Sequence, residues 1–235
     1  TDLKSIGWHS PDALHLLIES MKIAYADRAT YLGDPDFVKV PVRSLISPEY
    51  AKIRRQGINP RKATPSAQIK PGDPALIQRL SRESTETSHL TVVDRDRNAV
   101  SLTFTVNLGF GAGVVAKGTG IVLNNEMDDF AIAPNTPNAF GLVGDRANAI
   151  EPRKTPLSSM TPTIVTQNDQ VKMAVGAPGG STIITTVLQI ILNVLVYDMN
   201  VRKAVASPRI HHQWQPELLM VERFGLDPLT INNLK

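Results

Sequence analysis

The 235-residue sequence contains no cysteine. Disulfide bonds, thiolate zinc sites and cysteine nucleophiles are therefore excluded. The net charge is only +3 at pH 7, so the composition does not call for a nucleic acid or an anionic membrane as partner. The absence of cysteine leaves the compartment open, because it suits an exported protein as well as a cytosolic one.

Long hydrophobic runs are also missing. The most apolar stretch, residues 182–197, is interrupted by Gln189 and Asn193. It falls short of the roughly 20 apolar residues that a membrane-spanning helix needs, and it predicts a buried helix instead. The sequence begins TDLKSIGWHS, without the basic-then-apolar start of a signal peptide. We therefore expect a fragment or a processed piece of a longer product.

Helix signals dominate the first 57 residues. In residues 10–30, Ser10 can cap the helix, Pro11 suits its first turn, and apolar residues recur at helical spacing. Residues 47–57 repeat the Ser-Pro-Glu start and end in glycine, which predicts a shorter helix. Residues 57–86 contain four prolines and little periodicity. They predict an exposed, mobile linker.

The central part of the chain is rich in β-forming residues. Two hairpins are predicted there, over residues 88–107 and 161–177, with a further strand at 118–125. The remaining elements are expected at residues 179–197 (helix), 200–208 (helix), 217–222 (strand) and 227–234 (helix). Helices, then hairpins, then helices predict an antiparallel α+β layered fold rather than a regular βαβ repeat.

A glycine-rich segment, GAPGGST (176–182), follows a strand and opens a helix. It lacks the lysine of a P-loop, which argues against nucleotide binding. The backbone N–H groups of Gly179 and Gly180 at a helix start could hold an anion or stabilise a developing oxyanion. The glycines could equally serve only to let strand and helix pack closely.

Two polar segments are further candidates. NNEMDDF (124–130) places acidic residues directly after an apolar strand, without the pattern of a calcium loop. A carboxylate there could hold a substrate ammonium group. PLSSMTPTIV (156–165) contains paired serines that could hold a carboxylate, although a turn stabilised by local hydroxyl–backbone bonds is commoner.

The histidines of HHQW (211–214) do not predict a metal site. Adjacent residues on a strand point to opposite faces, so the two cannot easily chelate one ion, and no partner motif accompanies them. A packing role is the better prediction. No G-x-S-x-G motif is present either, so a Ser-His-Asp arrangement is not indicated.

Six segments occur in the order of a known family: TSHLTVVD, TFTVN, LNNEMDDF, PLSSMTPTIV, GAPGGSTIITTVLQ and PRIHHQW. Together they resemble the γ-glutamyltransferase (γ-glutamyltranspeptidase) family of N-terminal-nucleophile hydrolases. The resemblance implies an α+β fold that is part of a four-layer αββα sandwich. It also implies a precursor that cuts itself between Glu86 and Thr87. Residues 1–86 would then end the large subunit, most of which is missing, and residues 87–235 would form the small, catalytic subunit.

The resemblance assigns Thr87 as nucleophile. Its freed α-amine, with a reference pKa of about 7.7–8.0, can take the hydroxyl proton as a built-in general base. Thr105 would bond to Thr87 and polarise it. Gly179 and Gly180 would supply the oxyanion-hole N–H groups.

The same resemblance divides the substrate site by charge. Asn107, Glu126 and Asp129 would hold the α-amino group of a γ-glutamyl substrate, and Ser158 and Ser159 its α-carboxylate. No metal or cofactor is implied. The donor would be glutathione or a similar compound, the acceptor water, an amino acid or a short peptide, and the location the periplasm or outside the cell.

Two departures from the family pattern stand out. Phe140 occupies a lid-loop position where many bacterial members have tyrosine, so a hydroxyl contact to Asn107 would be lost. Ser88 replaces a second threonine at the cut site, a mild change.

Three alternatives remain open. The chain could belong to a cephalosporin or glutaryl acylase, or to a poly-γ-glutamate transferase of the same fold. It could also be an uncut, non-catalytic precursor fragment that only binds a partner. Asp129 argues against the acylase, because those relatives tend to lose this acid.

Overall fold

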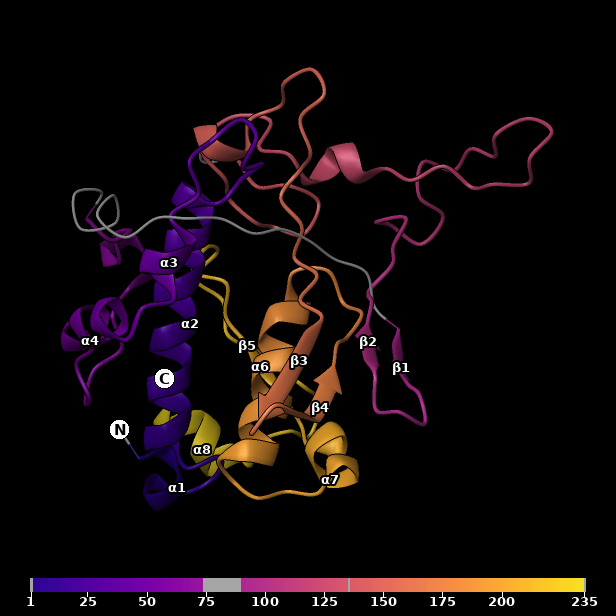
Figure 1. Ribbon diagram of the computed structural model, residues 1–235. Helices are drawn as coiled ribbons and strands as arrows, with labels where there is room; N and C mark the ends of the chain where they lie inside the picture. The colour runs from indigo at the N-terminus through magenta and orange to yellow at the C-terminus, as the bar shows by residue number, and fades with distance from the viewer. Residues whose placement is uncertain (1, 74–89, 135, 235) are drawn as a thin grey trace. The chain divides into compact units, whose positions relative to one another are not determined.

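The computed structural model describes residues 2–73, 90–134 and 136–234 (Figure 1). The chain divides into two compact units. The first comprises Thr1–Tyr31, Val40–Glu83 and Leu188–Lys235, and the second Leu32–Lys39 and Ser84–Val187. The expected cut between residues 86 and 87 lies outside the described residues, and the subunit boundary there stays a prediction.

The first unit is built on helix α2 (Pro11–Tyr31), which follows the short α1 (Leu3–Ile6). The Ser10 hydroxyl accepts a hydrogen bond from Ala13 N at 3.2 Å, which confirms the predicted cap. Leu14, Ile18 and Met21 lie on one face of α2 and form a buried cluster with Ile210. The apolar stripe read from the sequence is therefore the core face of this unit.

Two shorter helices follow α2 in this unit, α3 (Val42–Leu45) and α4 (Pro48–Gln56). The predicted cap of α4 is confirmed, because the Ser47 hydroxyl accepts from Tyr50 N at 3.1 Å. Gly57 ends α4, again as predicted.

Three residues of the segment that follows α4 are buried, so the prediction of an exposed linker over 57–86 is wrong at these three positions. Ser66, which opens the 3-10 turn η1 (Ser66–Gln68), is buried, and so are Ile69 and Gly72. The reason is chemical: α2 presents buried carboxylates that accept the backbone N–H groups of this segment, as Asp27 does from Gly72 at 2.9 Å. Residues 74–86 lie outside the described residues.

Four predicted C-terminal elements are confirmed: α6 (Thr182–Leu195), α7 (Val201–Ala206), β6 (Met220–Val221) and α8 (Pro228–Asn233). Helix α6 begins in the second unit and ends in the first, to which the other three belong. The first unit also contains β5 (Ile210–His211). β5 and β6 pair antiparallel. Gln189, which interrupts the apolar run of α6, is buried, and its amide bonds to both backbone groups of Ile210, at 2.8 Å and 3.0 Å. A polar residue is thus tolerated in the helix because its hydrogen bonds are satisfied.

The second unit contains the two predicted hairpins. β1 (Thr91–Val93) pairs antiparallel with β2 (Ala99–Ser101), and β3 (Thr163–Gln167) with β4 (Gln170–Val175). The hydroxyl of Ser101, at the end of β2, donates to the carbonyl of Val175, at the end of β4, at 3.4 Å. The two hairpins therefore lie side by side at these ends. Helices together with antiparallel hairpins confirm the α+β class.

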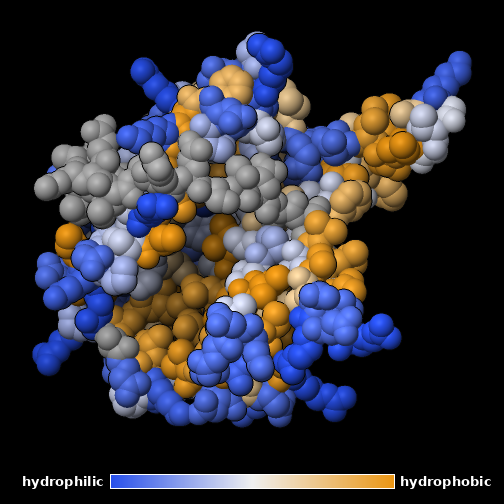
Figure 2. Space-filling model, viewed as in Figure 1, coloured by the Kyte–Doolittle hydropathy of each residue, from blue (hydrophilic) through white to orange (hydrophobic). Residues whose placement is uncertain are grey.

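Two β predictions are wrong for the described residues. The strand expected to reach residue 107 ends at Ser101. In residues 118–125, only Val122 takes part in a bridge, an isolated one to Val115. A strand needs a ladder of backbone hydrogen bonds to a neighbour. No described strand pairs with residues 102–107, and the bonds of residues 121–123 to residues 112–116 extend no further than the single bridge. Apolar side chains of these two segments stay exposed, among them Phe104 at 82% and Ile121 at 61%. Figure 2 shows hydrophobic side chains gathered along this part of the chain, at the upper right.

Candidate active site

The predicted nucleophile, Thr87, lies outside the described residues, so its geometry is not part of the site described below. The other eight candidates are all described, and all belong to the second unit. They fall into three groups: Thr105, Asn107 and the acidic turn; the serine loop; and the glycine pair.

Asn125 connects the acidic turn η2 (Glu126–Asp129) to the segment that contains Thr105 and Asn107. The Asn107 side chain donates to Asn125 O at 3.0 Å, and Asn125 Oδ1 accepts from Leu108 N at 3.0 Å. Thr105 Oγ1 in turn accepts from Asn107 N at 2.8 Å. The structure therefore brings Thr105, Asn107 and the acidic turn together. Sequence analysis did not single out Asn125, although it lies within the NNEMDDF motif.

Glu126 is the acid whose surroundings best suit a cationic ligand. Its Oε1 atom is buried and has no hydrogen-bond partner among the described residues. Burial raises the pKa of the Glu126 carboxyl above its ordinary value. An unpaired, buried carboxylate oxygen is costly, so an ammonium group placed beside it would be bound favourably.

The predicted serines lie in a loop just before β3. Ser158 Oγ accepts from Met160 N at 3.1 Å, which is the local turn bond that sequence analysis kept as an alternative. Ser159 is buried. The residue before them, Leu157, donates its N–H to Asn148 Oδ1 at 2.9 Å. Because Asn148 also bonds to Asp129 O, the serine loop and the acidic turn are linked through one side chain.

The glycine pair has the backbone that only glycine adopts easily, with φ of +133° at Gly179 and +56° at Gly180. The backbone N–H and the hydroxyl of Thr182 both donate to Gly179 O, at 3.2 Å and 2.9 Å. Within the described part of the chain, no group accepts a hydrogen bond from the N–H of Gly179 or Gly180. Two unengaged donors before a helix are suited to an oxyanion.

Phe140 lies against the glycine pair. A methyl group on Gly180 would come within 2.5 Å of the Phe140 ring. The loop around Phe140 is shaped by Asn138, whose Oδ1 accepts from Phe140 N and Leu142 N, both at 3.0 Å. The aromatic residue identified from the sequence as a departure is therefore a neighbour of the predicted oxyanion hole.

The two histidines of HHQW are buried in the first unit. His211 bonds to Gln213 Oε1 at 2.9 Å and meets the Tyr25 ring edge-on at 5.7 Å, as a packing role predicts. His212 faces Glu217 at 3.3 Å. Across residues 2–73, 90–134 and 136–234, no group of three or more acidic or histidine side chains is placed to hold a metal ion. No described helix is long and apolar enough to cross a membrane.

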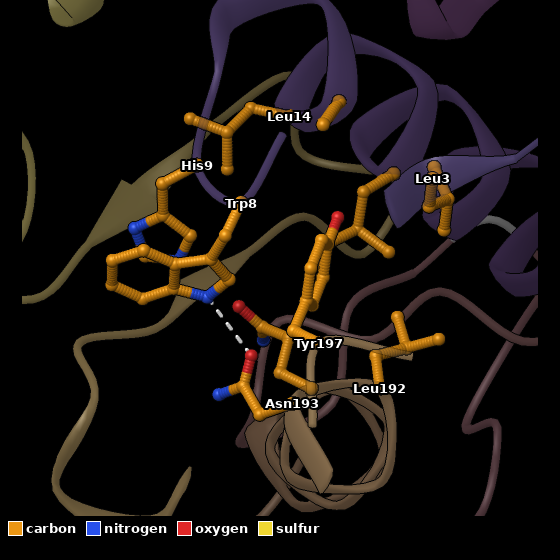
Figure 3. Close-up of a pocket in the computed structure, with 10 residues that line it drawn as sticks. Leu3, Trp8, His9, Leu14, Leu192, Asn193 and Tyr197 are labelled. Carbon is orange, nitrogen blue, oxygen red and sulfur yellow. Dashed lines mark hydrogen bonds between the residues drawn. The ribbon is translucent and has the colours of Figure 1, made fainter. Parts of the chain in front are cut away.

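A small pocket in the first unit is lined by Trp8, Asn193, Tyr197 and neighbouring apolar side chains (Figure 3). Two of these lining residues bond to each other, with Trp8 Nε1 donating to Asn193 Oδ1 at 2.9 Å. The free volume of the pocket, about 30 Å³, holds no more than a few water molecules. None of the predicted site residues lines it, so it is not the candidate substrate site.

Comparison with known proteins identifies relatives along the whole chain. The profile of the family described as gamma-glutamyltranspeptidase matches residues 1–235. A glutathione hydrolase proenzyme of Escherichia coli is 50% identical over 234 residues, which is 100% of this chain and 39% of that protein. A glutathione hydrolase proenzyme of a Pseudomonas species is 50% identical over 228 residues, 97% of this chain and again 39% of the relative. The chain thus spans about two fifths of the length of these curated relatives.

Solved structures give the same result. A mutant gamma-glutamyltranspeptidase of Helicobacter pylori is 54% identical, with a TM-score of 0.61 over 63% of this chain and 80% of that one. A cephalosporin acylase of Bacillus halodurans is 32% identical, with a TM-score of 0.70 over 86% of this chain and 33% of that one. Both solved structures therefore share the fold of this chain over the parts that the comparisons cover.

Proposed function

This chain belongs to the γ-glutamyltranspeptidase family, and we propose that it contributes the catalytic and substrate-binding residues of an enzyme that transfers or hydrolyses γ-glutamyl groups. The donor is glutathione or a similar γ-glutamyl compound, and the acceptor is water, an amino acid or a short peptide. The observation that best supports this proposal is the buried Glu126 oxygen without a partner. It belongs to a turn that hydrogen bonds join to Asn107 and, through Asn148, to the serine loop.

Thr87 is the nucleophile in the proposed mechanism. Its α-amine takes the hydroxyl proton while the oxygen attacks the γ-glutamyl carbonyl. Thr105 polarises the attacking hydroxyl, and the N–H groups of Gly179 and Gly180 stabilise the oxyanion. The leaving amine takes the proton, and a γ-glutamyl–Thr87 ester remains. Water or an acceptor amine then attacks this ester by the same steps in reverse order.

Substrate recognition is proposed to use both charges on the α-carbon of the γ-glutamyl group. Glu126 and Asp129, with Asn107, bind the ammonium group. The hydroxyls of Ser158 and Ser159 bind the carboxylate. An acid on one side and hydroxyl donors on the other also favour one orientation of the substrate, and with it one position of the reactive carbonyl relative to the nucleophile.

Activation by self-cleavage before Thr87 is part of the proposal, since the built-in base exists only after the cut. The similar E. coli and Pseudomonas proteins are named proenzymes. The remainder of the large subunit is the partner that this chain needs. We also propose a periplasmic or secreted location, on the strength of the family resemblance.

A cephalosporin acylase is the nearest alternative, because one solved acylase shares the fold. Two observations favour the γ-glutamyl enzyme over it. Identity to the H. pylori structure is 54%, against 32% for the acylase. Asp129 is also present, and an acylase whose substrate lacks an ammonium group has no use for two acids at this position.

The direct test uses the full-length protein that contains this chain. On a denaturing gel, the wild type should give two fragments and Thr87→Ala one. Thr85→Ala, which removes a neighbouring hydroxyl, is the matched control and should still cleave. The cleaved wild type should release p-nitroaniline from γ-glutamyl-p-nitroanilide. Cleaved protein without this release would overturn the proposed function.

A further inference from the structure

We propose that Asn148 is a positioning residue that fixes the spacing between the two charged halves of the substrate site. It ends the 3-10 turn η3 (Arg146–Asn148) and is only 6% exposed. This inference rests on the proposed function, because it takes the acidic turn and the serine loop as the binding sites for the substrate ammonium and carboxylate groups.

The Asn148 amide connects both halves directly. Its Nδ2 donates to Asp129 O at 2.8 Å, and its Oδ1 accepts from Leu157 N at 2.9 Å. Both partners are backbone groups. The carbonyl of Asp129 fixes the position of Asn148 Nδ2, and the N–H of Leu157 fixes the position of Asn148 Oδ1. Asn148 therefore acts through the backbone of Asp129 and of the residue before Ser158, and it touches no substrate atom itself.

The backbone of Asn148 is held as firmly as its side chain. Asn148 O accepts from Ala131 N at 2.9 Å, and Asn148 N donates to Asp145 O at 3.0 Å. Gly33 packs so closely on Ala147 O that a methyl group there would overlap it. With its main chain fixed on two sides, the side chain can act as a rigid spacer and not merely follow the loops that it joins.

A second hydrogen bond, from a residue other than Asn148, also holds the serine loop in place. Asp34 Oδ2 accepts from Thr155 N at 2.7 Å, three residues before Ser158. The serine loop is thus held at Thr155 by Asp34 and at Leu157 by Asn148. Of the two halves, Asp34 bonds only to the serine loop, and its other carboxylate oxygen accepts from Asp36 N at 3.0 Å. Asn148 bonds to both halves and therefore determines the distance between them.

Few side chains can replace Asn148. Aspartate has no N–H to offer Asp129 O, glutamine is one methylene too long for both bonds, and alanine removes the partner of two part-buried backbone groups. The spacing matters because the ammonium and carboxylate of a γ-glutamyl group are attached to one carbon. If the two half-sites drift apart, the substrate can engage only one of them well at a time.

The test compares Asn148→Ala with wild type in the full-length, self-cleaved enzyme, using γ-glutamyl-p-nitroanilide. We expect KM to rise about tenfold, equivalent to about 1.4 kcal/mol, with kcat within about threefold, because nucleophile and oxyanion hole are untouched. In a Ser158→Ala background, the same change should raise KM by less than about threefold, because its effect passes through the serine half-site. Equal effects in both backgrounds, or a KM for Asn148→Ala within about twofold of wild type, would overturn the proposal.

A matched control separates positioning from general stability. Asn193 lies in the first unit and is 5% exposed. Its side-chain amide also makes two hydrogen bonds: Oδ1 accepts from Trp8 Nε1 at 2.9 Å (Figure 3), and Nδ2 donates to Ala204 O at 3.3 Å. Asn193→Ala should lower Tm and leave KM unchanged. A rise in KM with Asn193→Ala equal to that of Asn148→Ala would show that the effect is not specific to the bridge and would overturn the proposal.

A conservative variant covers the case in which Asn148→Ala does not fold. Asn148→Asp keeps the acceptor for Leu157 N and loses only the donor to Asp129 O, so it should self-cleave and still raise KM. If neither variant self-cleaves, Asn148 acts before a substrate site exists and the proposal is wrong. The wild type reports on the proposed function and the variants on Asn148, so the two can fail separately.

Discussion

A methyl group on Gly180 would lie 2.5 Å from Cδ1 and 2.6 Å from Cε1 of the Phe140 ring. The ring therefore occupies the space that any side chain at position 180 would need. Gly180 is also one of the two residues whose N–H groups we assign to the oxyanion hole, so its backbone position bears directly on the proposed reaction.

Gly180→Ala should lower kcat strongly, by about tenfold or more, because the added methyl displaces either the ring or an oxyanion donor. The left-handed backbone adds about 1–2 kcal/mol for alanine. Steady-state kinetics on the self-cleaved enzyme measure this. The double variant Gly180→Ala/Phe140→Ala should recover part of the loss. Gly113→Ala is the control: it has a similar φ of +67° but no atom within 4 Å, so it should leave kcat unchanged. Failure of the double variant to recover any activity would argue against the steric account.

Glu126 should make donor binding depend on pH. Burial raises the pKa of its carboxyl, so Glu126 takes up a proton at a higher pH than an ordinary glutamate does. The neutral acid attracts the substrate ammonium group only weakly. KM for the donor should therefore be low above this raised pKa and should rise as pH falls through it.

The KM–pH profile of Glu126→Gln tests this assignment. This variant should have a high KM with no such dependence on pH. Asp128→Asn is the neighbouring control, because the Asp128 carboxylate already accepts from Asn125 Nδ2 at 2.7 Å and is not assigned to substrate. It should keep the wild-type dependence. A Glu126→Gln profile parallel to that of wild type would contradict the role of Glu126.

Gly72 is predicted to be irreplaceable for packing. A methyl group there would overlap the hydroxyl of Tyr50, which itself donates to Asp27 Oδ2 at 2.8 Å. Gly72→Ala should destabilise the protein by about 1–3 kcal/mol, the usual cost of overpacking, and thermal unfolding should show a lower Tm. Gly57→Ala is the control. Its nearest neighbour would be Arg54 O at 3.4 Å and its φ is −78°, so Tm should stay the same or rise.

Lys22 is predicted to be essential because it neutralises a buried acid. Its Nζ lies 2.8 Å from Glu19 Oε1 and donates to Thr64 O at 2.8 Å, and both charged side chains are almost fully buried. Lys22→Met should destabilise by about 3–5 kcal/mol, since it leaves Glu19 buried without its cation.

Two further variants test the Lys22 prediction by thermal unfolding. Adding Glu19→Gln to Lys22→Met should restore part of the lost Tm, because the orphaned charge is removed. Lys4→Met breaks an ion pair with Asp198 whose side chains are 60% and 70% exposed, and it should change Tm little. A small effect of Lys22→Met, equal to that of Lys4→Met, would refute the prediction.

Local signals in the sequence predicted most of the described helices and both hairpins. Ser10 and Ser47 are N-caps in the structure as well as in the sequence, because a cap depends on residues three positions away. The strand predicted at 118–125 is reduced to an isolated bridge. Its residues have the composition of a strand and bond to residues 112–116, but a strand also requires a ladder of paired residues, and composition says nothing about how far the pairing extends.

The site was predicted from motifs, and the connections within it were not. Residue types indicated the acidic segment 124–130 and the paired serines, and the family resemblance singled out Glu126 among the acids. Asn148 gave no signal, since its hydrogen-bond partners are 19 residues before it and 9 after it in the chain. Nothing in the local sequence separates such an asparagine from one that caps a turn.

The proposed mechanism depends above all on Thr87 as the nucleophile that carries the γ-glutamyl group. The most direct measurement is the mass of the small subunit after the full-length, self-cleaved enzyme has been mixed with a γ-glutamyl donor and quenched with acid. We predict a fragment that begins at Thr87, with a population heavier by one γ-glutamyl group attached to the Thr87 side chain. A γ-glutamyl group on any other residue, or turnover that survives in Thr87→Ala, would contradict the account.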